Sequence, residues 1–444
     1  MNYSETIKYL YEKLPMFSRT GPKALKPDLK NTQKLCELLD HPERKFKSVH
    51  IAGTNGKGSV SHMLAAIFQE HGFTTGLYTS PHIHDFRERI RINGRMIPEE
   101  SVVDFVENTK EMTRKIGPSF FELTFAMAMK YFADEKVDVA VVETGLGGRL
   151  DSTNVIMPEL SVITNIGWDH MDVLGDTLDK IAFEKAGIIK INIPVVIGEV
   201  LPETREVFLK KAEEMNAPIF FAQEHFEIVR EKTNELLELV VKSRDSHSEF
   251  NLDLDLKGVY QKKNIVTVLQ AVEVLKKEFH FDFEKIKSAL SQVSAATGFG
   301  GRWQIVHKNP MVVMDVGHNV NGFSEIIQQL SLMKYRALHI IIGMVKDKDI
   351  TAVLKLLPKD ANYFFTNAHI PRALSKEQFQ QKAGMFSLKG DVYEDVNLAL
   401  KSALKISSAE DLILICGSFF VIAEVDLKIF QMEKPADKIV MGKN

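Results

Sequence analysis

Residues 46–59 of the chain, Phe46-Lys-Ser-Val-His-Ile-Ala-Gly-Thr-Asn-Gly-Lys-Gly-Ser59, decide the fold prediction. The residues up to Ala52 are mostly apolar and predict a buried strand, whereas the glycines that follow predict a tight turn. From Val60 to Gly72 apolar residues recur at helical spacing, so a helix is expected to begin where the turn ends. A strand, a glycine-rich turn and a helix in this order are typical of a parallel α/β sheet.

The glycine-rich turn has the composition of a phosphate-binding loop. Glycines let backbone N–H groups turn inward, and the N-terminus of the following helix favours an anion. We expect Lys57 to reach the outer phosphates of a nucleotide and Ser59 to be available to magnesium. The pattern differs from the standard G-x-x-x-x-G-K-[ST], because Ile51 replaces the first glycine and Gly58 separates the lysine from the serine. The alternative is a glycine-rich turn that binds no nucleotide.

Outward from this segment, apolar runs alternate with helical patterns, as in a parallel α/β sheet. Further strands are expected at Gly76–Thr79, Val137–Val142, Leu160–Thr164 and Pro194–Gly198. Residues 226–256 alternate in polarity and are charged, so we expect them to form an antiparallel edge of the same domain. Helices are expected near Tyr260–Phe279 and Phe283–Val293.

The second part of the chain repeats the alternation on a smaller scale. Small residues and glycines in Ser294–Gly301 predict a linker. Strands are expected after it at Met311–Met314, Leu338–Ile342, Tyr363–Thr366 and Leu412–Cys416. The expected fold class is therefore α/β: a P-loop mononucleotide-binding parallel-sheet domain (residues 1–296) followed by a smaller Rossmann-like α/β domain (residues 297–444).

The composition excludes several classes of protein. The chain has 444 residues, of which 45% are hydrophobic and 26% charged, and its formal net charge of −3 argues against a surface for nucleic acid. Two cysteines are too few for a disulfide scaffold and indicate a reducing compartment. No apolar run approaches the roughly 20 residues of a membrane span, and the first residues lack the apolar core of a signal peptide. We expect a cytoplasmic monomer that binds no membrane.

Polar or glycine-rich residues follow the expected strands, where ligands of open α/β sheets bind. In the first domain, besides the phosphate loop, they are Ser80–His82, Glu143–Gly148 and Asn165–His170. In the second domain they are Asp315–Asn319, Gly343–Met344, Asn367–His369 and Gly417–Ser418. Eight such strand ends over two domains predict a cleft with a bound ligand.

Three residues at strand ends of the first domain predict a magnesium site beside the phosphate loop. Ser80, Glu143 and His170 offer oxygen and nitrogen ligands, and magnesium takes few protein ligands because it shares the rest with water and phosphate. Taken singly, each residue also fits a structural role, as a turn residue, a buried carboxylate or a core histidine.

Four further residues have both a chemical and a structural interpretation. Lys185 lies among apolar neighbours, so partial burial is expected to lower its pKa, but it also fits an ordinary helix lysine. Asp315 and His318 fit an orienting carboxylate and an acid–base group, or an ordinary turn capped by the aspartate. Arg302 follows the predicted linker. It is either a functional residue that reaches back across the predicted cleft or an ordinary surface arginine.

These motifs, in this order, resemble the folylpolyglutamate synthase and dihydrofolate synthase family, within the wider group of Mur ligases. The matching segments are His50–Ser59, Tyr78–His82, Glu143–Asn154, Asp169–His170, Glu184–Ile188, Gly301–Ile305, Asp315–Asn319, Gly343–Asp349 and Cys416–Phe419. The phosphate loop alone indicates a Mur-type ligase. The segment Gly148-Arg-Leu-Asp151, with Lys185-Ala-Gly-Ile188 and the Asp315–His318 pair, narrows the resemblance to the folate branch.

The resemblance implies an ATP-dependent acid–amino-acid ligase. ATP would phosphorylate a carboxylate of folate or dihydropteroate, and the amine of L-glutamate would attack the acyl phosphate and form an amide. The residues that the resemblance implies for catalysis are Lys57, Lys185, Asp315 and His318, with Lys185 carbamylated and two Mg²⁺ ions bound.

The resemblance also implies binding residues. For ATP they are Thr54, Asn55, Gly56, Lys57, Gly58, Ser59, Asn264, Arg302 and Asp315. For magnesium they are Ser80, Glu143 and His170, with Ser59 as a further candidate. For the pterin or pteroyl group they are Ser119, Phe120, Phe121, Glu122, Leu150, Asp151 and Ser152. For L-glutamate they are His318 and Ser418.

The sequence departs from the family pattern at three places and leaves two alternatives open. Val320 and Gly300 stand where the family often has proline, and Ser18–Pro27 only loosely resembles the family's early folate-site loop. One alternative is a cell-wall Mur ligase, although the phosphate loop begins too early for an N-terminal uridine-nucleotide domain. The other is a nucleotide-driven switch or binding protein, which has no use for the polar residues of the second domain.

Overall fold

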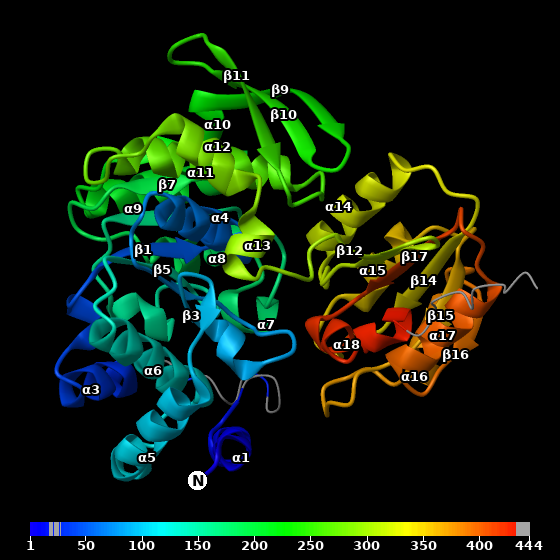
Figure 1. Cartoon of the computed structure of the whole chain (residues 1–444), viewed down its shortest axis with the longest axis horizontal. Coiled ribbons are helices and arrows are strands. Elements are labelled where there is room, and N and C mark those ends of the chain that lie inside the picture. Colours follow the sequence, from blue (N-terminus) through cyan, green and yellow to red (C-terminus); the bar gives the residue numbers. More distant parts are fainter. Residues whose placement is uncertain (17–20, 22–25, 27, 432–444) are drawn as a thin grey trace, which may run out of the picture. The chain divides into compact units, whose positions relative to one another are not determined.

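The computed structural model describes residues 1–16, 21, 26 and 28–431 and shows an α/β protein with mixed sheets (Figure 1). The chain forms two compact units. The first unit comprises Met1–Arg302, Asn319–Ser331 and Asp347–Asp349, and the second comprises Trp303–His318, Leu332–Lys346 and the chain from Ile350 onward. The domain boundary predicted at residues 296/297 stays a prediction. The first compact unit extends continuously to Arg302, and the second begins at Trp303.

The first unit is built on an eight-stranded sheet in the order β4-β3-β2-β5-β1-β6-β7-β8. The strands β2, β5, β1, β6, β7 and β8 run parallel, and β3 and β4 add an antiparallel hairpin at one edge. Their bounds are β1 (Lys47–Ala52), β2 (Thr75–Tyr78), β3 (Ile90–Ile92), β4 (Arg95–Met96), β5 (Val139–Glu143), β6 (Leu160–Ile163), β7 (Val195–Ile197) and β8 (Ile219–Phe221). No strand is predicted at β3, β4 or β8, which have only two or three residues each.

Both faces of this sheet are covered because its strands are apolar on both sides. On β5, Val139 and Val141 join the core cluster that contains the helices α4 (Lys57–Glu70) and α11 (Gln261–Leu275). Ala140 and Val142 join the cluster that contains α6 (Phe120–Asp134). The helices of this unit are α1 (Tyr3–Lys13), α3 (Lys30–Leu38), α4 (Lys57–Glu70), α5 (Glu99–Ile116), α6 (Phe120–Asp134), α7 (Met171–Leu174), α8 (Leu178–Ala186), α9 (Pro202–Glu214), α10 (Ala222–His225), α11 (Gln261–Leu275), α12 (Phe283–Leu290), α13 (Val293–Thr297) and α14 (Val320–Ser331).

Residues 226–254 form a separate antiparallel sheet of three strands rather than an edge of the large sheet. The strands are β9 (Phe226–Thr233), β10 (Leu237–Ser243) and β11 (Glu249–Leu254), in the order β11-β10-β9. Alternate residues of β10 (Leu237, Leu239 and Val241) are buried in the same core cluster as α4 and α11. The three-stranded sheet therefore joins the first unit by packing its apolar face on helices, and it does not pair with β8.

The second unit contains a six-stranded sheet in the order β12-β13-β17-β14-β15-β16. Its strands are β12 (Gln304–Lys308), β13 (Met311–Met314), β14 (Leu338–Ile342), β15 (Asn362–Phe365), β16 (Gly390–Val392) and β17 (Leu412–Cys416). Only β12 runs antiparallel to its neighbour, and β12 and β16 lie at the two edges, where the sequence pattern predicts no strand. The helices are α15 (Ile350–Leu356), α16 (Lys376–Gly384), α17 (Val396–Ile406) and α18 (Phe419–Ala423).

The predicted linker Ser294–Gly301 is partly helical. Its first residues belong to α13, whose Val293 and Thr297 are buried, and the helix ends at Gly298 with φ +69°. The small residues that suggested a flexible segment instead let α13 pack closely on α4. In the part of the chain that the structure describes, no helix is both long and apolar enough to cross a membrane.

Candidate active site

The loop between β1 and α4 depends on two glycines. Gly53 and Gly56 have φ of +150° and +83°, a backbone region that L side chains rarely adopt. A Cβ on Gly53 would lie 1.8 Å from Oγ1 of Thr164, and one on Gly56 would lie 2.3 Å from Oδ1 of Asn264. Thr164, directly after β6, and Asn264 of α11 therefore contact the loop backbone closely and restrict its conformation.

Hydrogen bonds to the segment after β6 hold the loop in place. The backbone N–H of Thr54 donates to the carbonyl of Asn165 at 3.0 Å, and that of Asn55 donates to Oδ1 of Asn165 at 2.9 Å. In return, Oγ1 of Thr164 donates to the carbonyl of Asn55 at 2.6 Å. The first N–H groups of α4 have no acceptor within the helix, and such groups favour an anion at the helix N-terminus.

A polar chain connects the first turn of α4 to α11. The amide of Gln261 donates to Oγ of Ser59 at 3.2 Å, and Nδ2 of Asn264 donates to Oε1 of Gln261 at 2.7 Å. All three side chains are buried. Ser59 and Asn264 are predicted to contact the nucleotide, but no role is predicted for Gln261. Its position three residues before Asn264, on the same face of the helix, was the signal that could have identified it.

Two lysines meet at one carbonyl of this loop. Nζ of Lys185, near the end of α8, donates to the carbonyl of Gly53 at 2.8 Å, and Nζ of Lys57 donates to the same oxygen at 3.1 Å. Lys185 is buried, and burial together with the charge of Lys57 lowers the pKa of Lys185 to about 7. The amine of Lys185 is thus available in its neutral, nucleophilic form near neutral pH.

Glu143 lies at the end of β5, beside the start of α4. Its carboxylate is buried, and Oε2 accepts a hydrogen bond from the backbone N–H of Ser80 at 3.1 Å. Burial raises the pKa of Glu143, while the charges of Lys57 and Arg302 oppose the rise. A Cβ on Gly58 would lie 3.9 Å from Oε2 of Glu143, so the carboxylate faces the first turn of α4.

This corner fits a hard cation. Among the described residues, Oε1 of Glu143 and Oγ of Ser80 have no protein hydrogen-bond partner, and both atoms are oxygens of the kind that magnesium prefers. The predicted third ligand, His170, has a different neighbour, because its Nε2 lies 3.4 Å from Nζ of Lys348. Within residues 1–16, 21, 26 and 28–431, no three His, Cys, Asp or Glu side chains cluster closely enough to hold a metal.

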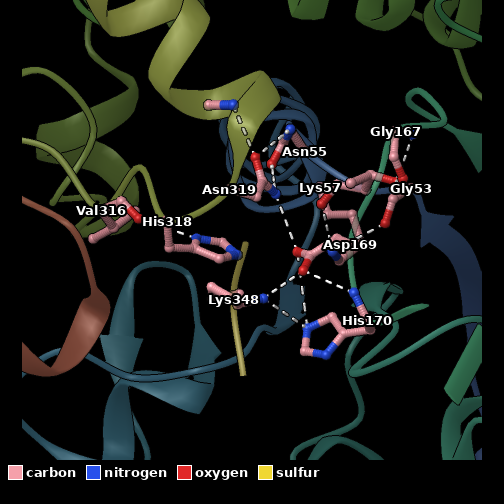
Figure 2. Close-up of polar contacts among 12 residues, drawn as sticks. Gly53, Asn55, Lys57, Gly167, Asp169, His170, Val316, His318, Asn319 and Lys348 are labelled. Atoms are coloured by element: carbon pink, nitrogen blue, oxygen red, sulfur yellow. Dashed lines mark hydrogen bonds and ion pairs between the residues drawn. The ribbon is translucent and has the colours of Figure 1, made fainter. Parts of the chain in front are cut away.

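His170 belongs to a network centred on Asp169 (Figure 2). Oδ2 of Asp169 accepts a hydrogen bond from Nδ2 of Asn319 at 3.0 Å, and its carboxylate forms an ion pair with Lys348. Asn319 also donates to Oδ1 of Asn55, in the loop between β1 and α4, at 3.1 Å. No role is predicted for Asp169, Asn319 or Lys348, although all three lie in segments that carry the family resemblance.

The remaining polar candidates lie in the second unit. Asp315 is buried, and its carboxylate accepts hydrogen bonds from the backbone N–H groups of Trp303 and Gly317 at 2.9 and 2.8 Å. Ser418 caps α18 by accepting from the N–H of Val421 at 3.2 Å. The ring of His318 lies 5.9 Å from that of Phe419, between centroids. The loops after β13 and β17 therefore place His318 and Ser418 at the same end of this sheet.

The comparisons with known proteins agree on one family. Residues 51–272 match the Mur ligase middle domain, and residues 301–419 match the Mur ligase glutamate ligase domain. The dihydrofolate synthase/folylpolyglutamate synthase of Bacillus subtilis (strain 168) is 35% identical over 416 residues, which are 90% of this chain and 94% of that protein. The chain belongs to the folylpolyglutamate synthase/dihydrofolate synthase family. It is an ATP-dependent glutamate ligase.

Solved structures of this family have the same fold as the ligase. Escherichia coli FolC in complex with DHPP and ADP superposes with a TM-score of 0.84 at 27% identity, covering 97% of this chain and 98% of that one. A Mycobacterium tuberculosis folylpolyglutamate synthase complexed with ADP gives a TM-score of 0.84 at 30% identity, covering 95% and 96%. The predicted family and the predicted glutamate ligase activity are confirmed.

In the ligase, the first candidate segment for the pteroyl group is the start of α6. Ser119 and Glu122 form a capping box: Oγ of Ser119 accepts from the N–H of Glu122 at 3.2 Å, and Oε2 of Glu122 accepts from the N–H of Ser119 at 2.6 Å. Phe120 packs on Tyr11, and Phe121 lies so close to the loop after β5 that a Cβ on Gly145 would be 2.5 Å from its ring. The two polar side chains thus have a structural role of their own.

The second candidate segment is Leu150–Ser152. Asp151 is buried and accepts hydrogen bonds from the N–H of Leu146 at 2.8 Å and from the N–H and Oγ1 of Thr153 at 3.0 and 2.5 Å. Of its two neighbours in the chain, Leu150 is partly buried and Ser152 is buried. The third place of interest, Ser18–Pro27, lies outside the described residues except for residues 21 and 26.

Proposed function

We propose that this ligase activates a carboxylate of dihydropteroate or a reduced folate as an acyl phosphate and joins it to the amine of L-glutamate. The observation that carries the proposal is the convergence of Lys57, Lys185 and Glu143 on the phosphate loop. We further propose that the first unit is a P-loop mononucleotide-binding domain and that the second is a Rossmann-like domain. The monomeric state and the cytoplasmic location remain predictions from the sequence.

The loop residues hold and neutralise the phosphates of ATP. The N–H groups at the start of α4 and the ammonium of Lys57 stabilise negative charge that grows during phosphoryl transfer. Glu143, Ser80 and Ser59 would hold magnesium, which supplies positive charge at the transferring phosphoryl group when bound. Asn264 and Arg302 would contact the nucleotide. ADP binding in related structures supports this assignment.

Lys185 is proposed to carry a carbamate. The ammonium first gives one proton to water, and the neutral amine then attacks the carbon of CO₂. An N–C bond forms, one C–O π bond opens to the carboxylate and a second proton leaves to water, so that in total the cation loses two protons and becomes a carboxylate. Because the pKa of Lys185 is about 7, about half of the amine is neutral at that pH. The resulting carboxylate would help to hold a second magnesium ion and would relieve the repulsion between Lys185 and Lys57.

The second unit is proposed to bind L-glutamate through His318 and Ser418, with Asp315 holding the loop that carries His318. Two backbone N–H groups fix the carboxylate of Asp315, and the strand ends after β13 and β17 are joined by a hydrogen bond from the N–H of Gly417 to the carbonyl of Gly317 at 3.2 Å. This rigid pair of loops can present both side chains to the amino acid.

The deciding experiment is an assay of ADP release with magnesium and L-glutamate, offering dihydropteroate, tetrahydrofolate or neither, with product mass as a second readout. We expect ADP release that depends on glutamate and on a pteroyl substrate, together with a product heavier by one glutamyl residue. Release with dihydropteroate identifies dihydrofolate synthase activity, and release with tetrahydrofolate identifies chain extension. ADP release that needs neither glutamate nor a pteroyl substrate would overturn the proposal in favour of a nucleotide-driven switch.

Lys185→Ala is expected to lose ligase activity and to regain part of it in millimolar formate or acetate. The small carboxylate would occupy the space of the truncated side chain and replace the carbamate. The measurement is the rate of glutamate-dependent ADP release against carboxylate concentration, with sodium chloride as the ionic-strength control. Absence of rescue combined with normal magnesium affinity would contradict carbamylation.

A further inference from the structure

One buried arginine of the first unit lacks a counter-ion. Arg89 ends the short helix η3 (Phe86–Arg89), directly before β3, and only 8% of its surface is exposed. Among the described residues no Asp or Glu side chain forms an ion pair with Arg89, whereas the neighbouring Arg87 pairs with Asp85 at 2.8 Å. Burying an unpaired charge is costly, so such a group indicates an anion that the protein alone does not supply.

The guanidinium of Arg89 is held from behind. Its Nε donates to Nδ1 of His82 at 2.7 Å. Because Nδ1 accepts this bond, the proton of the neutral ring lies on Nε2, which is 3.2 Å from the hydroxyl of Tyr11. The side chain also lies over the ring of Phe120, with Cζ 5.3 Å from the ring centroid. These three contacts fix the plane of the guanidinium.

The two terminal nitrogens of Arg89 are the unused part of the group. Within the described part of the chain these two nitrogens donate no hydrogen bond, and neither is fully enclosed by protein atoms. They therefore reach accessible space. A fixed guanidinium with both terminal NH₂ groups unused matches a carboxylate, which accepts two parallel hydrogen bonds.

The surroundings indicate which carboxylate this is. Arg89 lies over the ring of Phe120, a candidate contact of the pteroyl group. Its positive charge also favours the ionised carboxylate of Glu143, a candidate magnesium ligand. We propose that Arg89 binds the carboxylate of the pteroyl substrate that is to be phosphorylated and holds it beside the metal and phosphate site. This proposal rests on the proposed function, and it assigns the anion to the acid substrate rather than to ATP.

The test compares binding of dihydropteroate with binding of its carboxamide, in which a neutral amide replaces the carboxylate, by calorimetry without ATP. Two charge-assisted hydrogen bonds should make the wild type prefer the carboxylate by roughly tenfold or more. Arg89→Gln is expected to abolish this preference to within about twofold and to leave the affinity for the carboxamide unchanged. Arg89→Lys keeps the charge without the planar fork, so it should keep an intermediate preference.

The matched control is Arg91→Gln. Arg91 is equally buried on β3, but Nη1 already donates to the carbonyl of Gly94 at 3.1 Å, so the carboxylate preference should stay as in the wild type. The proposal is overturned if both Arg89 variants keep the wild-type preference for the carboxylate over the carboxamide. It is also overturned if the variants keep that preference and lose affinity for ATP. If the wild type releases ADP without any pteroyl substrate, the proposed function itself fails, which is a separate result.

Discussion

Lys57→Ala is expected to lower the rate of glutamate-dependent ADP release by roughly 10²–10³-fold or more. The ammonium of Lys57 lies against the carbonyls of Gly53 and Thr54 at 3.1 and 3.3 Å, within the loop that would hold the phosphates. Its removal takes away a positive charge that counts more in the transition state than in the bound substrate, so kcat should fall more than the affinity for ATP. Steady-state kinetics of ADP release against ATP concentration measures both.

Two variants separate this effect from a general loss of charge or of structure. Lys57→Arg keeps the charge and should retain more activity than Lys57→Ala. Lys262→Ala removes a lysine of α11 that pairs with Glu231 at 3.0 Å, outside the loop, and should leave kcat within about twofold of wild type. Near-wild-type turnover in Lys57→Ala would show that the ammonium does not act on the transferring phosphoryl group.

Glu143→Gln is the second change with a large expected effect, a fall in turnover of roughly 10²–10³-fold. The amide has the shape of the carboxylate and can still accept from the N–H of Ser80, but it offers magnesium no negative charge. A titration of ADP release with magnesium should show that the variant needs a much higher magnesium concentration, and Glu143→Asp, which keeps the charge on a shorter stem, should recover part of the activity.

The same variant should not lose stability. Burial raises the pKa of Glu143 above the ordinary value of 4.5, so ionising this carboxyl at neutral pH opposes folding. This cost shrinks as the pH falls through the folded-state pKa and is absent below the ordinary value. The amide of the Glu143→Gln variant carries no charge at any pH, so thermal unfolding of the metal-free protein at pH 7 should give an equal or higher Tm. A clearly lower Tm would indicate that Glu143 acts in folding rather than in metal binding.

Local patterns were sufficient to predict the strands and helices that carry the phosphate loop. The run Phe46–Ala52, the glycines and the apolar stripe of α4 are features of neighbouring residues, and backbone sterics and burial act on such neighbours directly. The strands β3, β4, β8, β12 and β16, which lie at or next to a sheet edge, could not be predicted in this way, because much of their stability as strands comes from the strands that they pair with. The helical start of Ser294–Gly301 was missed for a related reason, since packing on α4 outweighs composition.

By itself, the sequence determined the α/β class, the strand, glycine-rich turn and helix that form β1, the loop and α4 and, through the order of its motifs, the family and the ligase activity. The tertiary structure alone decided which groups meet: Lys185 and Lys57 at the carbonyl of Gly53, Lys348 beside His170, and Arg89 without a carboxylate partner among the described residues. Such contacts join residues far apart in the chain, and their pKa values and pairing depend on burial and distance. Neither quantity exists until the chain has folded.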